Sequence, residues 1–137
     1  MAQDSLQIEL ATPASKSSIG EAQSCSAPGV LGKFQILPNH TAFVSELATG
    51  EVKVDLSGQA RYFAITGGYL EVVDNKVLLL LEAAEAAEDI DVARAEQARE
   101  RAEHRLHSND PAVDISRAQA ALSRALNRLA IAGKASR

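Results

Sequence analysis

The chain has 137 residues, of which 46% are hydrophobic and 23% charged, a foldable composition for one domain or a small domain with an appendage. Its net charge of −4 argues against nucleic acid as the main partner and against attraction to anionic lipid, because both need a basic face. No apolar run approaches the roughly 18 residues that insert across a bilayer, no signal peptide is apparent, and the single cysteine, Cys25, cannot form an internal disulfide.

Alternating apolar residues predict short β-strands through the first half of the chain. The alternation appears in four runs, at residues 6–10, 52–56, 63–65 and 70–73, and a continuous apolar run at residues 77–81 has the length of a strand. Turn signals separate these runs at Thr49-Gly50, Ser57-Gly58, Gly67-Gly68 and Asp74-Asn75. Because Asp and Asn tolerate positive φ, the last of these predicts a tight hairpin. Short strands at this spacing favour an antiparallel sandwich or barrel.

From about Glu82 the chain becomes rich in alanine, glutamate and arginine, which are strong helix formers. A first helix is expected from Ile90 to about Leu106. Its apolar stripe at helical spacing consists of Ala95, Ala98, Ala102 and Leu106.

A break at residues 108–111 separates this helix from a second one. Asp110 or Asp114 is the expected cap, Pro111 suits a first-turn position, and Gly133 ends the helix. The second apolar stripe consists of Ala118, Ala121, Leu122, Ala125, Leu126 and Leu129.

The two periodicities predict an α+β chain with two domains. An N-terminal antiparallel β-sandwich is expected over residues 1–86, followed by a C-terminal antiparallel αα-hairpin within residues 87–137, its helices lying at about 88–132. The facing sides of the helices are mostly alanine, which buries little area, so their packing is expected to be weak and changeable. An ordinary rigid hairpin has the same composition.

Two stretches resemble signatures of the epsilon subunits of bacterial F-type ATP synthases. Residues 37–40 read Leu-Pro-Asn-His, where the family typically has Leu-Pro-Gly-His. Residues 64–72 read Ala-Ile-Thr-Gly-Gly-Tyr-Leu-Glu-Val, where the family has Ala-x-x-Gly-Gly-Phe-x-Glu-Val. Asn39 and Tyr69 are the departures, and both are mild because Asn accepts positive φ and Tyr fills the volume of Phe. Motif order, spacing and the helical tail agree along nearly the whole chain.

The resemblance implies a rotor subunit that is not itself an enzyme. Its sandwich would bind the gamma subunit and the c-ring, coupling H⁺ or Na⁺ flow to ATP synthesis at the cytoplasmic face of the plasma membrane. Its helices would extend along gamma towards the alpha/beta hexamer and inhibit ATP hydrolysis. Residues 29–40 match the loop that faces the c-ring, so Lys33, Asn39 and His40 are the expected contacts. His40 fits equally well as a turn residue that bonds local backbone.

A third stretch resembles the Ile/Leu-Asp-x-x-Arg-Ala motif of epsilon subunits that bind ATP, since residues 90–95 read Ile-Asp-Val-Ala-Arg-Ala. The resemblance implies an ATP site that consists of Glu85, Ile90, Asp91, Arg94, Ala95, Arg101, Arg105, Arg124 and Arg128.

Helical spacing places Arg94, Arg101 and Arg105 on one face of the first helix, and it places Arg124 and Arg128 one turn apart on the second. If these faces converge, the guanidinium groups repel one another until a polyphosphate neutralises them. In that interpretation Asp91 orients an arginine or contacts the adenine amino group, and Glu85 touches the base. ATP is then a regulatory ligand that keeps the hairpin folded, and its loss releases the helices.

Three alternatives stay open. In the first, the arginines lie on a solvated helix face and pair with Glu96, Glu100 and Glu103, so that the chain is the same stalk subunit but has no ATP site. A generic adaptor shares the fold prediction. An enzyme is disfavoured because no Gly-rich phosphate loop or Ser-His-Asp order is present, and a metal site is disfavoured because His104 and His107 lack a third ligand.

Overall fold

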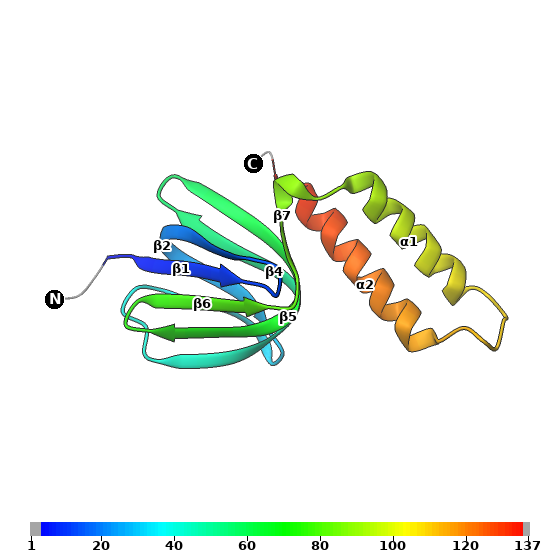
Figure 1. Ribbon diagram of the computed structural model, residues 1–137, viewed down its shortest axis with the longest axis horizontal. Coiled ribbons are helices and arrows are strands. Elements are labelled where there is room, and N and C mark those ends of the chain that lie inside the picture. Colours follow the sequence, from blue (N-terminus) through cyan, green and yellow to red (C-terminus); the bar gives the residue numbers. More distant parts are fainter. Residues whose placement is uncertain (1–3, 136–137) are drawn as a thin grey trace.

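The computed structural model describes residues 4–135, in which a β-rich domain is followed by two antiparallel helices (Figure 1). This confirms the predicted fold class. The elements in chain order are β1 (Leu6–Ala11), β2 (Lys16–Gly29), β3 (Gly32–Ile36), β4 (Phe43–Leu56), β5 (Gln59–Val73), β6 (Lys76–Leu81), β7 (Ala84–Ala86), the 3₁₀ turn η1 (Ala87–Asp89), α1 (Val92–Leu106) and α2 (Ile115–Ala132).

The strands form a sheet that closes on itself. Pairing runs from β1 through β6, β5, β4 and β2 and returns to β1, while β3 extends from β2 and β7 from β5. All pairs are antiparallel except β1 with β6, a parallel pair that the antiparallel prediction did not include. The closed circuit encloses one core, whose fully buried side chains include Leu6, Ile8, Leu70 and Leu79.

Two of the four predicted turns are wrong. Thr49-Gly50 and Gly67-Gly68 lie inside the long strands β4 and β5, where Thr49 pairs with Thr66. A Cβ on Gly50 would lie 2.7 Å from the Cβ of Pro28, so this glycine lets two strands approach closely. The other two turns are confirmed, at residues 57–58 and at Asp74-Asn75, where both residues have positive φ.

Aspartates begin both helices. Asp91 caps α1 and Asp114 caps α2, so α1 starts at Val92, two residues later than expected. Asp110 instead accepts a 2.9 Å hydrogen bond from the Ala112 N–H in the connecting turn. Pro111 lies in this turn, before the helix, because α2 begins only at Ile115, so its predicted first-turn position is wrong. Gly133 is the C-cap of α2, as predicted.

Alanines form the seam between the helices, as the stripes predicted. The fully buried members are Ala95 and Ala102 on α1 and Ala118 and Ala125 on α2. Leu126, assigned to the second stripe, is 48% exposed and does not belong to the seam. The C-terminal end of α2 packs on β4, β5 and η1, and α1 lies on its outer side, with the connecting loop far from the sheet (Figure 1). Within residues 4–135, neither helix is long and apolar enough to cross a membrane.

Candidate functional site

A hollow of about 350 Å³ lies where α2 meets the sheet. One wall is a segment of β5, a second is β7 with Ala83 before it, and the third is one face of α2. The polar side chains that line it are Thr66, Glu85, Arg124, Asn127 and Arg128. It is therefore a junction site, and opening the hairpin would separate its walls.

Glu85 and Arg128 make a two-pronged ion pair across this hollow. The Nε of Arg128 donates to Oε1 of Glu85 at 2.8 Å, and Nη2 donates to Oε2 at 3.0 Å. β7 fixes Glu85 through its pairing with β5, where Glu85 lies opposite Ala64. Both side chains are about one-third exposed, so water screens the pair only in part.

The five predicted arginines do not all line this hollow. Arg124 and Arg128 do, together with the predicted Glu85. Arg94 and Arg101 are exposed on the outer helix. Arg105 lines a different hollow, with Arg117, near the connecting loop. The structure thus brings together one acid and two arginines of the predicted set.

The remaining three predicted residues have structural roles beside the hollow. Ile90 is buried in a small apolar cluster with Ala87 and Ile131. Ala95 lies in the alanine seam. The carboxylate of Asp91 accepts a 3.1 Å hydrogen bond from the backbone N–H of Arg94.

The Asp-x-x-Arg pattern of the motif at residues 90–95 occurs a second time in the same chain. Residues 114–117 read Asp-Ile-Ser-Arg, and Asp114 caps α2 with the same 3.1 Å bond to the N–H of Arg117. An aspartate three residues before an arginine is therefore explained at both places by helix capping. Capping alone accounts for Asp91 without any ligand.

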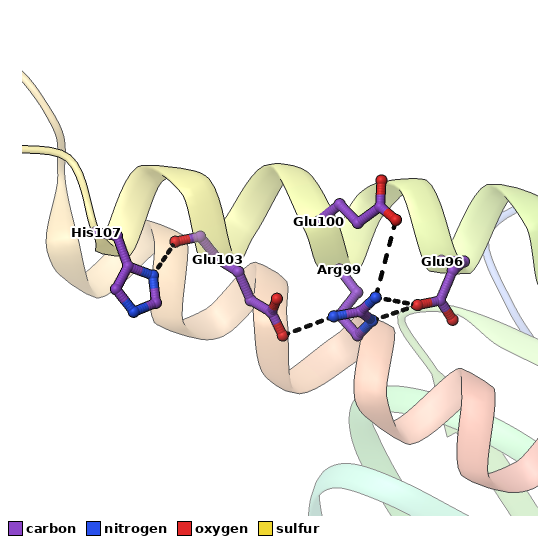
Figure 2. Close-up of polar contacts among 5 residues, drawn as sticks. All are labelled: Glu96, Arg99, Glu100, Glu103 and His107. Atoms are coloured by element: carbon purple, nitrogen blue, oxygen red, sulfur yellow. Dashed lines mark hydrogen bonds and ion pairs between the residues drawn. The ribbon is translucent and has the colours of Figure 1, made fainter.

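The glutamates of α1 bind an arginine outside the predicted set (Figure 2). Arg99 makes ion pairs with Glu96 and Glu103, the latter at 2.8 Å, and lies 3.9 Å from Glu100. The hydrogen bonds that Arg99 donates to Glu103, and then to Glu96, raise the pKa of its guanidinium. Within residues 4–135, no ion pair links a carboxylate to the predicted arginines Arg94, Arg101, Arg105 or Arg124.

The segment 29–40, predicted as one loop that faces the c-ring, contains the strand β3, so the three predicted contacts do not share a loop: Lys33 lies at the start of β3, and Asn39 and His40 lie in the loop after it. Lys33 is exposed on β3, and Asn39 has a φ of 68° in the turn. The backbone N–H of Asn39 donates to Oδ1 of Asn75 at 2.6 Å. The Nδ1 of His40 lies 2.7 Å from the carbonyl oxygen of Thr41, which is the local backbone bond of the alternative interpretation.

Sequence reasoning missed several polar residues and one apolar residue. Asn127 donates to the Gly50 carbonyl at 3.0 Å, and Lys134 makes an ion pair with Glu51, so both tie α2 to β4. Asn127 could have been predicted as a residue of this site, because it follows Arg124 by one turn on the same face of the second helix. Leu31 is fully exposed between β2 and β3, and an apolar pair set between Gly29 and Gly32 was the available signal.

Both parts of the chain match families of ATP synthase domains. The ATP synthase delta/epsilon chain beta-sandwich domain matches residues 5–87, and the delta/epsilon chain long alpha-helix domain matches residues 88–133. The ATP synthase epsilon chain of Nitratidesulfovibrio vulgaris is 44% identical over 131 residues, which cover 96% of this chain and 98% of that protein. The epsilon chain of Geobacter sulfurreducens is 42% identical over 135 residues, with 98% of each chain covered.

Solved structures share the fold at lower sequence identity. A chain of the Euglena gracilis mitochondrial ATP synthase, in an OSCP/F1/c-ring structure, has a TM-score of 0.80 at 24% identity over 95% of this chain and 82% of its own. A chain of the Tetrahymena thermophila mitochondrial ATP synthase central stalk and c-ring has a TM-score of 0.60 at 17% identity, covering 99% and 98%. With family matches that together span residues 5–133, the chain belongs to the ATP synthase delta/epsilon chain family.

Proposed function

We propose that the chain is the epsilon subunit of the central stalk of a bacterial F-type ATP synthase, and that its hairpin regulates ATP hydrolysis. The observation that carries this is the near-complete match to epsilon chains, over 96% of the chain at 44% identity. Subunits of this family are not catalysts, so the chain acts by binding and by moving.

The sandwich is the part that binds the gamma subunit and the c-ring in this proposal. It exposes large apolar side chains, including Leu31, Val44 and Tyr69, of which Leu31 has no cover at all. Apolar groups held in water by a closed, well-packed sheet favour contact with a partner. Lys33, Asn39 and His40 add polar contacts to the c-ring, and this attachment holds the chain peripherally at the cytoplasmic face of the plasma membrane.

The docked hairpin is the form that permits hydrolysis. When it is released, the helices extend along gamma towards the alpha/beta hexamer and block the rotor. ATP is the regulatory ligand, with its phosphates on Arg124 and Arg128 at the junction and on Arg94 in the first turn of α1. Four of the five predicted arginines have no ion-pair partner within the described residues, so their positive charges favour a bound anion. ATP shifts the balance only by its greater affinity for the docked form.

Reconstitution of the catalytic complex with and without this chain tests the proposal. We expect the chain to lower ATP hydrolysis at low ATP and the inhibition to fade as ATP rises. Arg128→Ala and Arg94→Ala should remove the dependence on ATP, whereas Arg117→Ala, an exposed arginine outside the site, should not. A chain that fails to bind gamma contradicts the stalk assignment, and unchanged ATP binding in both alanine variants contradicts the nucleotide site.

Two observations favour a second version of this function, a stalk subunit whose hairpin needs no nucleotide. Glu85 already neutralises Arg128, and Asp91 is engaged as a helix cap. Hydrolysis that is inhibited to the same degree at all ATP concentrations would identify this version.

A further inference from the structure

The hairpin is attached to the sheet by a short stretch of α2 and its C-terminal cap. Asn127 bonds the Gly50 carbonyl, Arg128 pairs with Glu85, and Lys134 pairs with Glu51. The apolar part of the junction is small, because Ile131 packs in a cluster of only Ala64, Ala87 and Ile90, with Tyr62 and Ala132 at its margin. Since little apolar area is buried, the polar contacts carry a large share of the attachment.

Among these contacts the pair of Glu85 with Arg128 has the geometry of a phosphate contact. Two carboxylate oxygens accept two parallel N–H bonds from one guanidinium, as two phosphate oxygens would. The pair joins β7 to α2, elements that the hairpin's release would separate. The arginine cannot offer the same two N–H groups to Glu85 and to a ligand at once.

We propose that Glu85 is a built-in counter-ion that holds the hairpin on the sheet without a ligand, and that a bound polyphosphate takes Arg128 from it. The proposal rests on the proposed function, in which hairpin docking is the regulated step. It reverses one expectation from the sequence, that arginine repulsion opens the hairpin whenever ATP is absent. It also changes the role of Glu85. From the sequence, Glu85 is expected to contact the base of the nucleotide, whereas here Glu85 competes with the ligand for Arg128.

The first measurement uses the full chain without ligand. Spin labels on Ser17→Cys and Gln119→Cys, both exposed sites, report the distance between sheet and hairpin by pulsed electron paramagnetic resonance. Mild urea brings the docked and released populations into a measurable range. The variants are Glu85→Gln, Arg128→Gln and their combination. Glu88→Gln is the matched control, because Glu88 also pairs with an arginine, Arg61 at 3.1 Å, but Arg61 belongs to the sheet.

We expect Glu85→Gln to lower the docking equilibrium constant roughly three- to tenfold, the range of a partly screened ion pair. Arg128→Gln should do the same, the combination should be no worse than either variant alone, and Glu88→Gln should have no effect. The exchange of Glu85→Arg with Arg128→Glu should restore docking, which separates loss of the pair from general damage to the fold. If Glu85→Gln docks as the unaltered chain does, the proposal is overturned.

The second measurement adds ATP, or tripolyphosphate as a probe without a base. Because the ligand no longer competes with a carboxylate for Arg128, either probe should increase docking by a larger factor in Glu85→Gln than in the unaltered chain. A smaller factor in Glu85→Gln would overturn the competition and mark Glu85 as a ligand contact. If neither probe changes docking in either chain while Glu85 still controls ligand-free docking, the nucleotide proposal fails and the counter-ion stands.

Discussion

Asn75 joins the turn between β5 and β6 to the loop that carries His40. The residue is buried, and its Oδ1 accepts the 2.6 Å hydrogen bond from the Asn39 N–H. Its Nδ2 donates to Oδ1 of Asn39 at 3.3 Å, and its φ is 65°. One residue thus meets two demands, positive φ in a tight turn and a link between two loops.

Two substitutions of Asn75 separate these demands. Asn75→Gly keeps the backbone conformation and loses the side-chain bonds, so we expect a loss of about 1 kcal/mol in the free energy of unfolding. Asn75→Ala loses the bonds and also strains the backbone, so the loss should reach about 2–3 kcal/mol. Urea unfolding measures both values. Equal losses in the two variants would show that the positive φ contributes nothing.

Cys25 is fully buried in β2, and burial raises the pKa of its thiol to about 12 from an ordinary value of 9.0. Since the thiolate is the reactive form, a thiol reagent should modify the folded chain only at the rate of unfolding. The folded state disfavours the thiolate, so this residue's contribution to stability is complete below pH 9.0 and is lost as pH rises towards about 12.

The comparison that isolates this effect is Cys25→Ala. Its free energy of unfolding, subtracted from that of the unaltered chain, should be constant up to pH 9.0 and shrink above it. A constant difference throughout, or rapid labelling of the folded chain, would show that the thiol is accessible to solvent.

At the scale of elements, the two aspartate caps allow a test of whether Asp91, in the motif at residues 90–95, acts only as a helix cap or also binds a ligand. Asp91→Ala should cost about 1 kcal/mol of helix stability and speed hydrogen exchange at the first turn of α1. Asp114→Ala should do the same for α2, far from the junction. Asp91→Asn keeps an oxygen that caps the helix, so it should preserve both exchange protection and any response to ATP. If Asp91→Asn keeps the protection but loses the ATP response, the carboxylate has a role in ligand binding.

Some helices and strands could be predicted because the sequence pattern that indicates them is local. The strands around Leu6 and Val52 alternate clearly, the continuous apolar run at residues 77–81 has the length of a strand, and the helices follow from their composition and caps. β2 was not predicted, because its 14 residues are mostly small, with serine, alanine, glycine and one cysteine in place of alternating large side chains. Glycines at 50 and 67–68 resembled turns, since sequence alone cannot distinguish a glycine that ends a strand from one that lets strands approach.

At the scale of the whole molecule, the junction site depends on contacts between distant parts of the chain. Glu85 and Arg128 are 43 residues apart, and nothing local indicates that one should neutralise the other. The spacing of the arginines correctly describes each helix face, but it does not say how the two helices are rotated about their axes. That rotation is set by the alanine seam and by the docking of Ile131. Arg105 also belongs to the last turn of α1, so its position along the helix places it near the connecting loop, far from Arg94.

The sandwich carries its own core, and this predicts how the chain tolerates loss of the hairpin. Every buried side chain of the main cluster lies between Leu6 and Ala86, and α2 covers only a small patch around Ala64, Ala87 and Ile90. A chain that ends at Ile90 should therefore unfold cooperatively, with a loss of about 1–2 kcal/mol for the uncovered apolar groups. Thermal unfolding followed by circular dichroism measures this.

Ile131→Ala in the full chain is the matched control, because it removes the main apolar contact of α2 with this patch and keeps both helices. The shortened chain and this variant should both retain the sharp thermal transition of the sheet. The shortened chain should also bind gamma but no longer inhibit hydrolysis, since the closed circuit of strands needs nothing from residues 91–135 to persist. A shortened chain that unfolds gradually would show that the helices are part of the sheet's cooperative unit, and release of the hairpin could not then be a regulatory step.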